Sequence, residues 1–308
     1  MKKIPKLPLV IVLAMLIIIS AYSIRLVTAN SNKSPFLRGV VEVFSKNEGS
    51  IYPRQKFSSF TFPSLSAKAY LAVYEGDFGK RYLVMYNTDK KLPIASITKI
   101  TTAMVALNSS GSLLAQFSTS TIEVGTMNRY SISDILAVKE LVKSMLVESD
   151  NDAARAICEN ESGNIIQRMN AFANYSGAPS TRFFNCTGLD GEGGGTNTST
   201  ASDVATLMSI LVKKNPELVG IVSLPTASIL KIDGSIHHIA ISTYEFMEQE
   251  LPFPIIVGKT GFTDLAKQNL VLALQAPKGI LYIVVLGSDD READMKKLAD
   301  YVKGNFEW

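Results

Sequence analysis

The chain contains few histidines and cysteines, the side chains on which many catalytic and metal sites depend. Its only histidines among 308 residues are His237 and His238, which are adjacent. A Ser-His-Asp triad needs a histidine placed beside a serine, whereas we expect this pair to be solvated in a loop or strand. Two neighbouring histidines with no Cys or Glu at ligand spacing cannot supply the three or four ligands of a metal site. We therefore predict neither histidine-based catalysis nor a bound metal.

An excess of charge of one sign is also missing from most of the chain. Residues 1–30 hold four basic residues and no acidic one, so the other 278 residues carry a net charge of −1 out of a total of +3. A nearly neutral body without a basic stripe is a poor electrostatic match for nucleic acid. With 46% apolar and 19% charged residues the chain is not disordered, and it is long enough to bury a core.

The N-terminus has the pattern of a targeting or anchoring segment. Residues 7–24 are mostly apolar and follow Lys2, Lys3 and Lys6, which places the N-terminus in the cytoplasm. An uncleaved membrane anchor over residues 1–30 is favoured over a signal peptide cleaved near Ala29, and over a buried soluble helix. No cysteine follows the apolar run, so a lipoprotein is excluded. We expect the rest of the chain to be exported, either held at the outer face of the cytoplasmic membrane or secreted.

Beyond this segment, composition divides the chain into a polar linker, residues 31–60, and one domain, residues 61–308. Cys158 and Cys186 could form one disulfide in an oxidising compartment. The alanines around Cys158 on a helical pattern favour a small buried thiol instead.

The body of the chain shows strands at both ends and helices between them. Two strand-like runs joined by a hairpin come first, three β-branched runs come last, and a glycine-rich loop spans 184–200. Strands are predicted at 67–74, 81–86, 255–259, 269–274 and 280–286, and helices at 96–107, 133–147 (capped by Ser131 or Ser133), 152–159, 165–175, 202–213 and 290–302. The order predicts an α+β fold in which an antiparallel sheet of about five strands from both chain ends is flanked by helices, with an inserted, mostly helical subdomain.

Without a usable histidine, lysine is the remaining base for a serine nucleophile. Ser96-Ile97-Thr98-Lys99 places Lys99 one helical turn from Ser96, on the same face and at a helix N-terminus that stabilises negative charge. Ser228-Ile229-Leu230-Lys231 has the same pattern, so the spacing alone is a weak signal. Ser96 is distinguished by Ser149-Asp150-Asn151 between two predicted helices and by Lys259-Thr260-Gly261 at the end of a predicted strand. The order S-x-x-K, S-x-N, K-T-G is typical of penicillin-binding proteins and class A β-lactamases.

The wider sequence resembles the serine D-alanyl-D-alanine carboxypeptidases, low-molecular-weight penicillin-binding proteins of the peptidase S11 type. The resemblance covers about residues 60–303. It includes P-x-A-S-x-T-K at 93–99, S-x-N-D-A-A around 149–154, G-L-D at 188–190 and S-T-A-x-D at 199–203. The stretch 258–264 with Asn269-Leu270-Val271 is similar to the family's G-x-K-T-G-x-T-D and N-L-V. It implies a β-lactamase/penicillin-binding-protein-like fold. It also implies removal of the terminal D-alanine from peptidoglycan stem peptides, inhibition by β-lactam antibiotics and no cofactor.

The resemblance also implies a role for each motif residue. Ser96 would attack the carbonyl and Lys99, its pKa lowered by burial and by the cation Lys259, would take the proton. Ser149 would relay a proton to the leaving amine, and Asn151 would bind substrate and position Lys99. The backbone N–H groups of Ser96 and Phe262 would form the oxyanion hole. Lys259, Thr260 and Arg291 would bind the substrate carboxylate, and Gly261 would let the substrate strand approach closely.

Two departures and several alternatives stay open at this point. Lys267 stands where the family commonly has glycine, and Ser242-Thr243-Tyr244 stands where it has Thr-Asn. A β-lactamase of the same fold is one alternative, although its glutamate base would be Glu192, in a glycine-rich loop and without the expected asparagine four residues later. A D,D-endopeptidase and a non-catalytic cell-wall-binding homologue are the others.

Overall fold

The computed structural model describes residues 53–56, 63–107, 114–116, 129–161, 164–243 and 251–308. The predicted anchor and most of the predicted linker lie outside these residues. Within them, no helix combines the length and the apolar character that crossing a bilayer requires.

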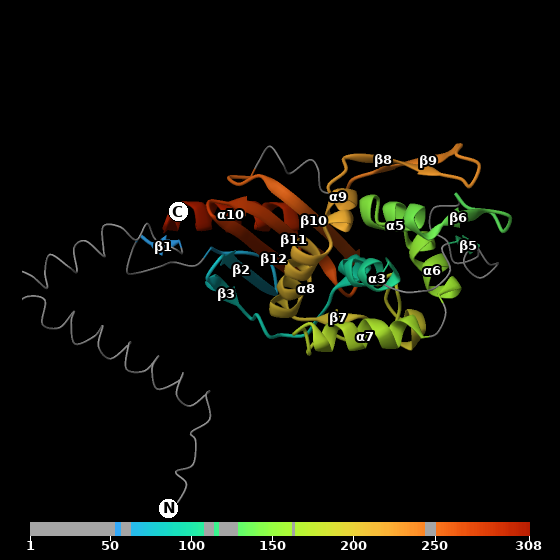
Figure 1. Cartoon of the computed structure of the whole chain (residues 1–308). Coiled ribbons are helices and arrows are strands. Elements are labelled where there is room, and N and C mark those ends of the chain that lie inside the picture. The colour runs from blue at the N-terminus through green and yellow to red at the C-terminus, as the bar shows by residue number, and fades with distance from the viewer. Residues whose placement is uncertain (1–52, 57–62, 108–113, 117–128, 162–163, 244–250) are drawn as a thin grey trace, which may run out of the picture. The chain divides into compact units, whose positions relative to one another are not determined.

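A five-stranded antiparallel sheet with the order β10-β11-β12-β2-β3 forms the centre of the domain (Figure 1). Its strands are β2 (Ala69–Gly76), β3 (Gly79–Tyr86), β10 (Ile255–Thr263), β11 (Lys267–Ala276) and β12 (Gly279–Ser288). Strand β2 from the early part of the chain pairs with β12 from the late part, with Leu71 opposite Val284. The predicted sheet of about five strands from both chain ends is therefore confirmed.

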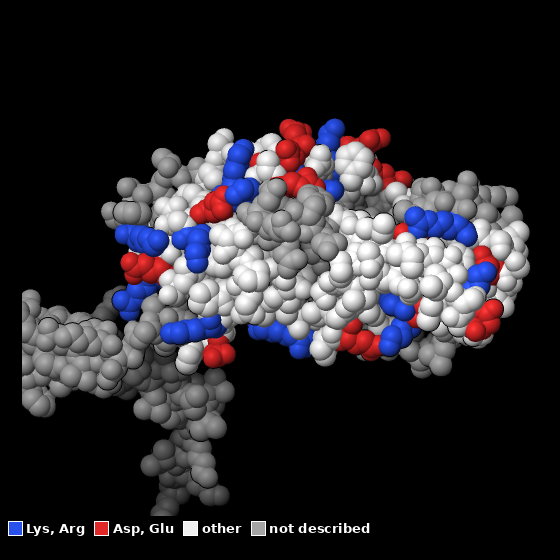
Figure 2. All heavy atoms as spheres, turned by 90° about the horizontal axis from the view of Figure 1, so that it is seen from above, with Lys and Arg blue, Asp and Glu red and all other residues white. Residues whose placement is uncertain are grey.

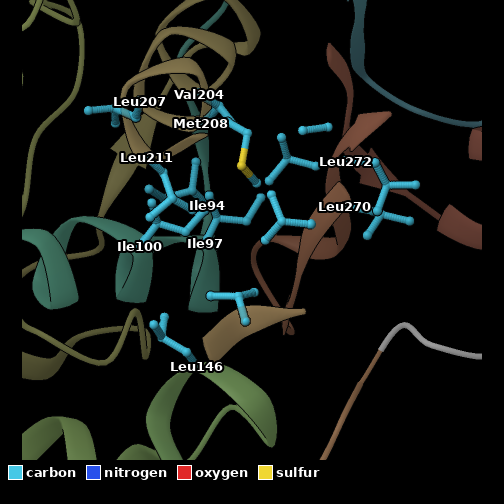
Figure 3. Packing of buried hydrophobic residues seen from close by; sticks show 14 of the residues in the cluster. Ile94, Ile97, Ile100, Leu146, Val204, Leu207, Met208, Leu211, Leu270 and Leu272 are labelled. Carbon is cyan, nitrogen blue, oxygen red and sulfur yellow. The ribbon is translucent and has the colours of Figure 1, made fainter. Parts of the chain in front are cut away.

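Helices cover both faces of this sheet. Residues 281–286 of β12 are buried without interruption, and since successive side chains of a strand point to opposite faces, neither face of β12 is open to solvent. Helices α8 (Ala201–Lys214) and α10 (Arg291–Asn305) both pack on the sheet. Figure 3 shows Met208 and Leu211 of α8 in one cluster with Ile94, Ile97 and Ile100, and this cluster also includes Leu270 of β11. This shared core fixes the segment that carries Ser96 against the sheet.

The middle of the chain forms the mostly helical part that the sequence predicts (Figure 1). Its elements are the 3₁₀ turn η2 (Ala95–Ile97), α3 (Thr98–Leu107), α5 (Val138–Val147), α6 (Asn151–Asn160), α7 (Ile165–Tyr175) and α9 (Pro216–Val222). Helix α7 has the predicted bounds. Outside the main sheet, short strands pair β4 (Leu92–Pro93) with β7 (Thr198–Ser199), β5 (Leu114–Gln116) with β6 (Ile135–Ala137), and β1 (Arg54–Gln55) with β13 (Phe306–Glu307).

Two local predictions are wrong. The helix expected from residue 133 begins at Val138 without a side-chain cap, because Ile135–Ala137 pairs with Leu114–Gln116 as a strand. The hairpin of β8 (Thr226–Leu230) and β9 (Ile236–Ile241) is not in the predicted element list, and it packs on α5. The second S-x-x-K copy lies at this hairpin, where Ser228 and Lys231 are not one helical turn apart.

The surface agrees with the charge distribution expected from the sequence. On the face shown in Figure 2, basic and acidic side chains are interspersed rather than gathered by sign. This face offers no basic stripe for a nucleic acid.

Candidate active site

The site begins where η2 leads into α3. Lys99, in the first turn of α3, is completely buried, and its Nζ donates to three oxygens at 2.7 Å: Ser96 Oγ, Asn151 Oδ1 and the carbonyl of Thr187. Three separate segments of the chain therefore hold one amine beside the hydroxyl of Ser96. Ala95, directly before Ser96, has φ +48°, a conformation that non-glycine residues rarely adopt.

Burial is the main cause that lowers the pKa of Lys99 from 10.5 to about 7. The carboxylates of Asp150 and Glu192 oppose this effect, and the guanidinium of Arg155 adds to it. Of the two expected causes, burial is therefore confirmed as the dominant one, whereas the charges that shift the pKa of Lys99 are those of Asp150, Glu192 and Arg155 and not that of Lys259. A lysine with a pKa near 7 is half neutral at neutral pH, so it can accept a proton.

The second segment connects α5 to α6. Ser149 lies between the two helices with φ +66°, a conformation that costs about 1–3 kcal/mol for a non-glycine residue and that persists only where the surroundings enforce it. Asp150 caps α6 by accepting from the backbone N–H of Asp152 at 2.8 Å and of Ala153 at 3.2 Å. Asn151, the first residue of α6, thereby comes to face Lys99.

A buried polar network holds the two neighbours of Ser149. Asp150 accepts from Tyr130 Oη at 2.7 Å and Ser144 Oγ at 2.8 Å, and Glu148 pairs with His238 Nε2 at 2.7 Å. The predicted solvated histidine pair is wrong, since the side chains of His237 and His238 are 6% and 11% exposed. This network explains how the strained backbone at Ser149 is maintained.

The same network contains the ligand-type cluster of Glu148, Asp150 and His238, whose ligand atoms lie within 4.8 Å of one another. The spacing of these residues in the sequence does not predict that His238 lies close to the carboxylates of Glu148 and Asp150. Hydrogen bonds within the protein, from Tyr130 and Ser144 and from Arg129 to Glu148, already use these oxygens. These hydrogen bonds explain the cluster as part of the polar network that holds the backbone around Ser149.

The third segment is β10, the edge strand of the sheet next to η2. Lys259 is completely buried, and its Nζ donates to Ser149 Oγ at 2.8 Å and to the carbonyl of Thr260 at 3.1 Å. Burial lowers the pKa of Lys259 well below 10.5, and the charges of Lys99 and Arg291 lower it further. The two lysines therefore act on a common site, each beside one serine hydroxyl.

The end of β10 lies against the backbone around Ser96. A Cβ on Gly261 would come within 2.8 Å of the Ile94 carbonyl oxygen and 3.2 Å of Ser96 N. Glycine is thus required here by the close approach of the chain's own backbone around η2, and a close approach of the substrate strand stays a prediction. Phe262, the next residue, is 58% exposed. The segments that carry the Ser96 and Phe262 N–H groups are therefore adjacent.

Thr260 and Arg291 also lie at this end of the strand. Thr260 Oγ1 is 2.8 Å from Thr243 Oγ1, so the residue standing in place of the family's Thr-Asn pair contacts the K-T-G motif. Arg291 approaches the Gly261 carbonyl at 3.5 Å and pairs with Glu292 at 2.8 Å. The structure thus brings every residue of the predicted site to one region.

The glycine-rich loop supplies residues that the motifs did not identify. Thr187 provides the carbonyl that binds Lys99, and its hydroxyl donates to Glu192 in a short hydrogen bond. Glu192 also pairs with Arg155 Nε at 2.9 Å. Cys158 of α6 forms a disulfide with Cys186, so the expectation of a buried thiol is wrong. The loop is visible in the sequence as a glycine run, but its contacts with α6 are not.

A buried lysine beside a serine hydroxyl, a second serine–lysine pair facing it and an antiparallel sheet flanked by helices define a serine acyl-transfer enzyme of the penicillin-binding and β-lactamase-like class. The family model for D-alanyl-D-alanine carboxypeptidase matches residues 56–290. The chain belongs to this family, peptidase S11, and is a serine hydrolase.

Similar proteins include both carboxypeptidases and endopeptidases. The chain is 26% identical to the D-alanyl-D-alanine endopeptidase of Escherichia coli over 244 residues, 73% of this chain and 77% of that protein. It is 28% identical to the D-alanyl-D-alanine carboxypeptidase DacF of Bacillus subtilis over 264 residues, 76% of this chain and 61% of that protein. Ampicillin-bound penicillin-binding protein D2 of Listeria monocytogenes superposes with a TM-score of 0.67 at 26% identity, covering 79% of this chain and 100% of that chain.

Proposed function

We propose that Ser96 is the nucleophile of a D-alanyl-D-alanine carboxypeptidase that removes the terminal D-alanine from peptidoglycan stem peptides. The observation that carries this assignment is the bond from buried Lys99 Nζ to Ser96 Oγ at 2.7 Å, with the pKa of Lys99 lowered to about 7. Neutral Lys99 takes the hydroxyl proton while Ser96 Oγ attacks the carbonyl carbon between the last two D-alanines.

The backbone N–H groups of Ser96 and Phe262 are assigned to the oxyanion of the tetrahedral intermediate, a contribution of about 2.7–4 kcal/mol per donor in enzymes where it has been tested. Ser149, which Lys259 Nζ contacts at 2.8 Å, passes a proton to the departing amine of D-alanine. Asn151 positions Lys99 and binds the substrate backbone. Lys259, Thr260 and Arg291 bind the terminal carboxylate, and water then hydrolyses the acyl-enzyme.

Labelling with a fluorescent penicillin tests this proposal. We expect a stable acyl-enzyme in the wild-type protein and none in Ser96→Ala. Ser228→Ala is the matched control, because Ser228 begins the other S-x-x-K sequence and lies on a strand; it should label like the wild type. Labelling that survives Ser96→Ala would refute the assignment, rapid loss of the label would indicate a β-lactamase, and a complete lack of labelling would indicate a non-catalytic homologue.

A D,D-endopeptidase is the second candidate, because similar proteins of Escherichia coli and Pseudomonas aeruginosa bear that name. Digestion of purified pentapeptide monomers and of cross-linked dimers separates the two activities. Release of free D-alanine from the monomer supports the carboxypeptidase, whereas conversion of dimers to monomers alone supports the endopeptidase.

We also propose that residues 1–30 anchor an exported domain at the outer face of the cytoplasmic membrane. The Lys-flanked apolar run and the Cys158–Cys186 disulfide support this location, since disulfides persist mainly in oxidising compartments. Membrane fractionation of the full chain, with N-terminal sequencing of the mature protein, tests retention of the anchor. Recovery of a soluble protein that begins after Ala29 would show a cleaved signal and a secreted enzyme.

A further inference from the structure

Helix α6 carries three side chains toward the glycine-rich loop on one face. Asn151, Arg155 and Cys158 are spaced by four and then three residues, so they lie on the same side of the helix over about two turns. Asn151 Oδ1 accepts from Lys99 Nζ, Arg155 Nε pairs with Glu192 at 2.9 Å, and Cys158 is bonded to Cys186. One helical face therefore makes a hydrogen bond, an ion pair and a covalent bond around Lys99.

The loop side of this arrangement also contacts Lys99 directly. Cys186 immediately precedes Thr187, whose carbonyl accepts from Lys99 Nζ at 2.7 Å. The carbonyl of Cys186 accepts from Thr102 Oγ1 of α3 at 2.9 Å. The disulfide thus joins the segment carrying one acceptor of the Lys99 amine, Thr187 O, to the helix carrying another, Asn151 Oδ1.

The loop needs a restraint of this kind. It contains Gly188, Gly191, Gly193 and Gly194 with positive φ, and glycine leaves the backbone with more conformational freedom than other residues. The disulfide links residues 28 positions apart and limits that freedom at Cys186. Cys186 is next to Thr187, whose carbonyl oxygen accepts from Lys99 Nζ.

We propose that the Cys158–Cys186 disulfide is a positioning element for Lys99, and that its reduction slows the acylation of Ser96. This inference rests on the proposed function. The disulfide is accessible, because Cys158 is partly exposed and a surface cavity of about 240 Å³ is lined by both cysteines together with Arg155, Thr187 and Glu192.

A dithiol is the class of reductant that reaches this bond. Its thiolate attacks one sulfur, a mixed disulfide forms, and its second thiol closes a cyclic disulfide. Two electrons and two protons pass to Cys158 and Cys186, which become free thiols. The loop is then tied to α6 only by non-covalent contacts such as the Arg155–Glu192 ion pair.

We expect reduction to affect both the rate and the pH dependence of acylation. A displacement of about 1 Å in a catalytic arrangement can cost about a hundredfold in rate, so a loss of tenfold or more is expected. Water admitted beside Lys99 weakens the desolvation that lowers its pKa, so the acid limb moves to higher pH. The charges of Asp150, Glu192 and Arg155 act on the pKa of Lys99, and Lys259, whose own pKa is lowered by Lys99, belongs to the same site. Reduction removes none of these groups.

The experiment compares four samples of the full chain: oxidised wild type, wild type reduced by dithiothreitol with its two thiols counted, the reduced protein after reoxidation, and Cys158→Ala/Cys186→Ala. Fluorescent-penicillin acylation rates are measured from pH 5 to 9, and circular dichroism reports folding. We expect the reduced protein and the double variant to fold but to acylate slowly with a raised midpoint, and reoxidation to restore the rate. The double variant in dithiothreitol is the control for effects of the reagent.

Equal rates and midpoints in oxidised wild type and in either disulfide-free form would overturn the inference. Loss of the native circular dichroism spectrum in both disulfide-free forms would also overturn it, since the bond would then support the whole fold rather than Lys99. If the oxidised wild type is not labelled at Ser96 at all, the proposed function fails instead, which is a different result.

Discussion

The pH dependence of acylation is a direct test of Lys99 as the base. With a pKa of about 7, Lys99 is half neutral at pH 7, about one-tenth neutral at pH 6 and almost fully neutral at pH 9. The acylation rate of the wild-type protein should therefore fall about fivefold from pH 7 to pH 6 and rise less than about twofold from pH 7 to pH 9.

Stopped-flow measurement of fluorescent-penicillin acylation across this range checks the prediction. A lysine with its usual pKa of 10.5 would instead give a rate that rises about tenfold per pH unit from pH 7 to pH 9. Such a continuous rise would refute the argument from burial. Lys99→Arg is the companion variant, and it should not acylate because a guanidinium does not release its proton at these pH values.

The stability of the protein provides an independent measure of the same shift. The folded-state pKa of Lys99 lies below its unfolded-state value, so between pH 7 and about 10.5 the unfolded chain binds a proton that the folded protein does not. Stability consequently rises with pH in this window. Urea unfolding should show the wild type gaining about 2 kcal/mol more than Lys99→Met between pH 7 and pH 9, at about 1.4 kcal/mol per pH unit above the midpoint. An equal gain in both proteins would contradict the shift.

Three further substitutions test other parts of the site. Gly261→Ala places a Cβ 3.2 Å from Ser96 N and 2.8 Å from a carbonyl oxygen, so we expect acylation to slow about tenfold or more while the circular dichroism spectrum stays native. Lys267 has φ +57°, a conformation that glycine adopts without strain. Lys267→Gly should therefore relieve about 1 kcal/mol of strain and raise Tm by about 2–4 °C in a thermal melt. An unchanged or lower Tm would show that the backbone at Lys267 is not strained. Glu192 raises the pKa of Lys99, so Glu192→Gln should move the acid limb of the acylation profile to lower pH, and a shift to higher pH would contradict its electrostatic effect.

The elements that the sequence predicts well are those with local signals. Helix α7 begins after the cap Asn164, which accepts from Gln167 N, and ends at the glycine and proline that follow Tyr175. The three late strands are continuous β-branched runs separated by turns, and each is found close to its expected place. Order and spacing of the three motifs were sufficient to predict that their residues lie together, as the Lys99–Ser96 and Lys259–Ser149 contacts show. These motifs fall at element ends, where side chains converge.

Features that depend on long-range pairing could not be predicted in the same way. The caps Ser131 or Ser133 place the residues before α5 in the predicted helix, but Ile135–Ala137 forms a strand because it pairs with Leu114–Gln116. His238 becomes buried because β9 packs on α5 and brings it to Glu148, 90 residues earlier in the chain. The sequence around His238 does not show that its partner is Glu148, and the sequence around Glu148 does not show that its partner is His238.

The extent to which Lys99 is buried, and therefore the size of its pKa shift, could be known only from the folded structure. Each lysine of the site is fully buried and hydrogen-bonded to a serine, and two ammonium groups held this way disfavour each other's charge. Under the proposed function, the substrate carboxylate binds beside Lys259 and favours its charged form. That charge in turn favours the neutral form of Lys99, which acylation requires. Lys259 therefore affects Lys99 most when an anionic substrate is bound, whereas in the free enzyme desolvation is the largest cause that lowers the pKa of Lys99 to about 7.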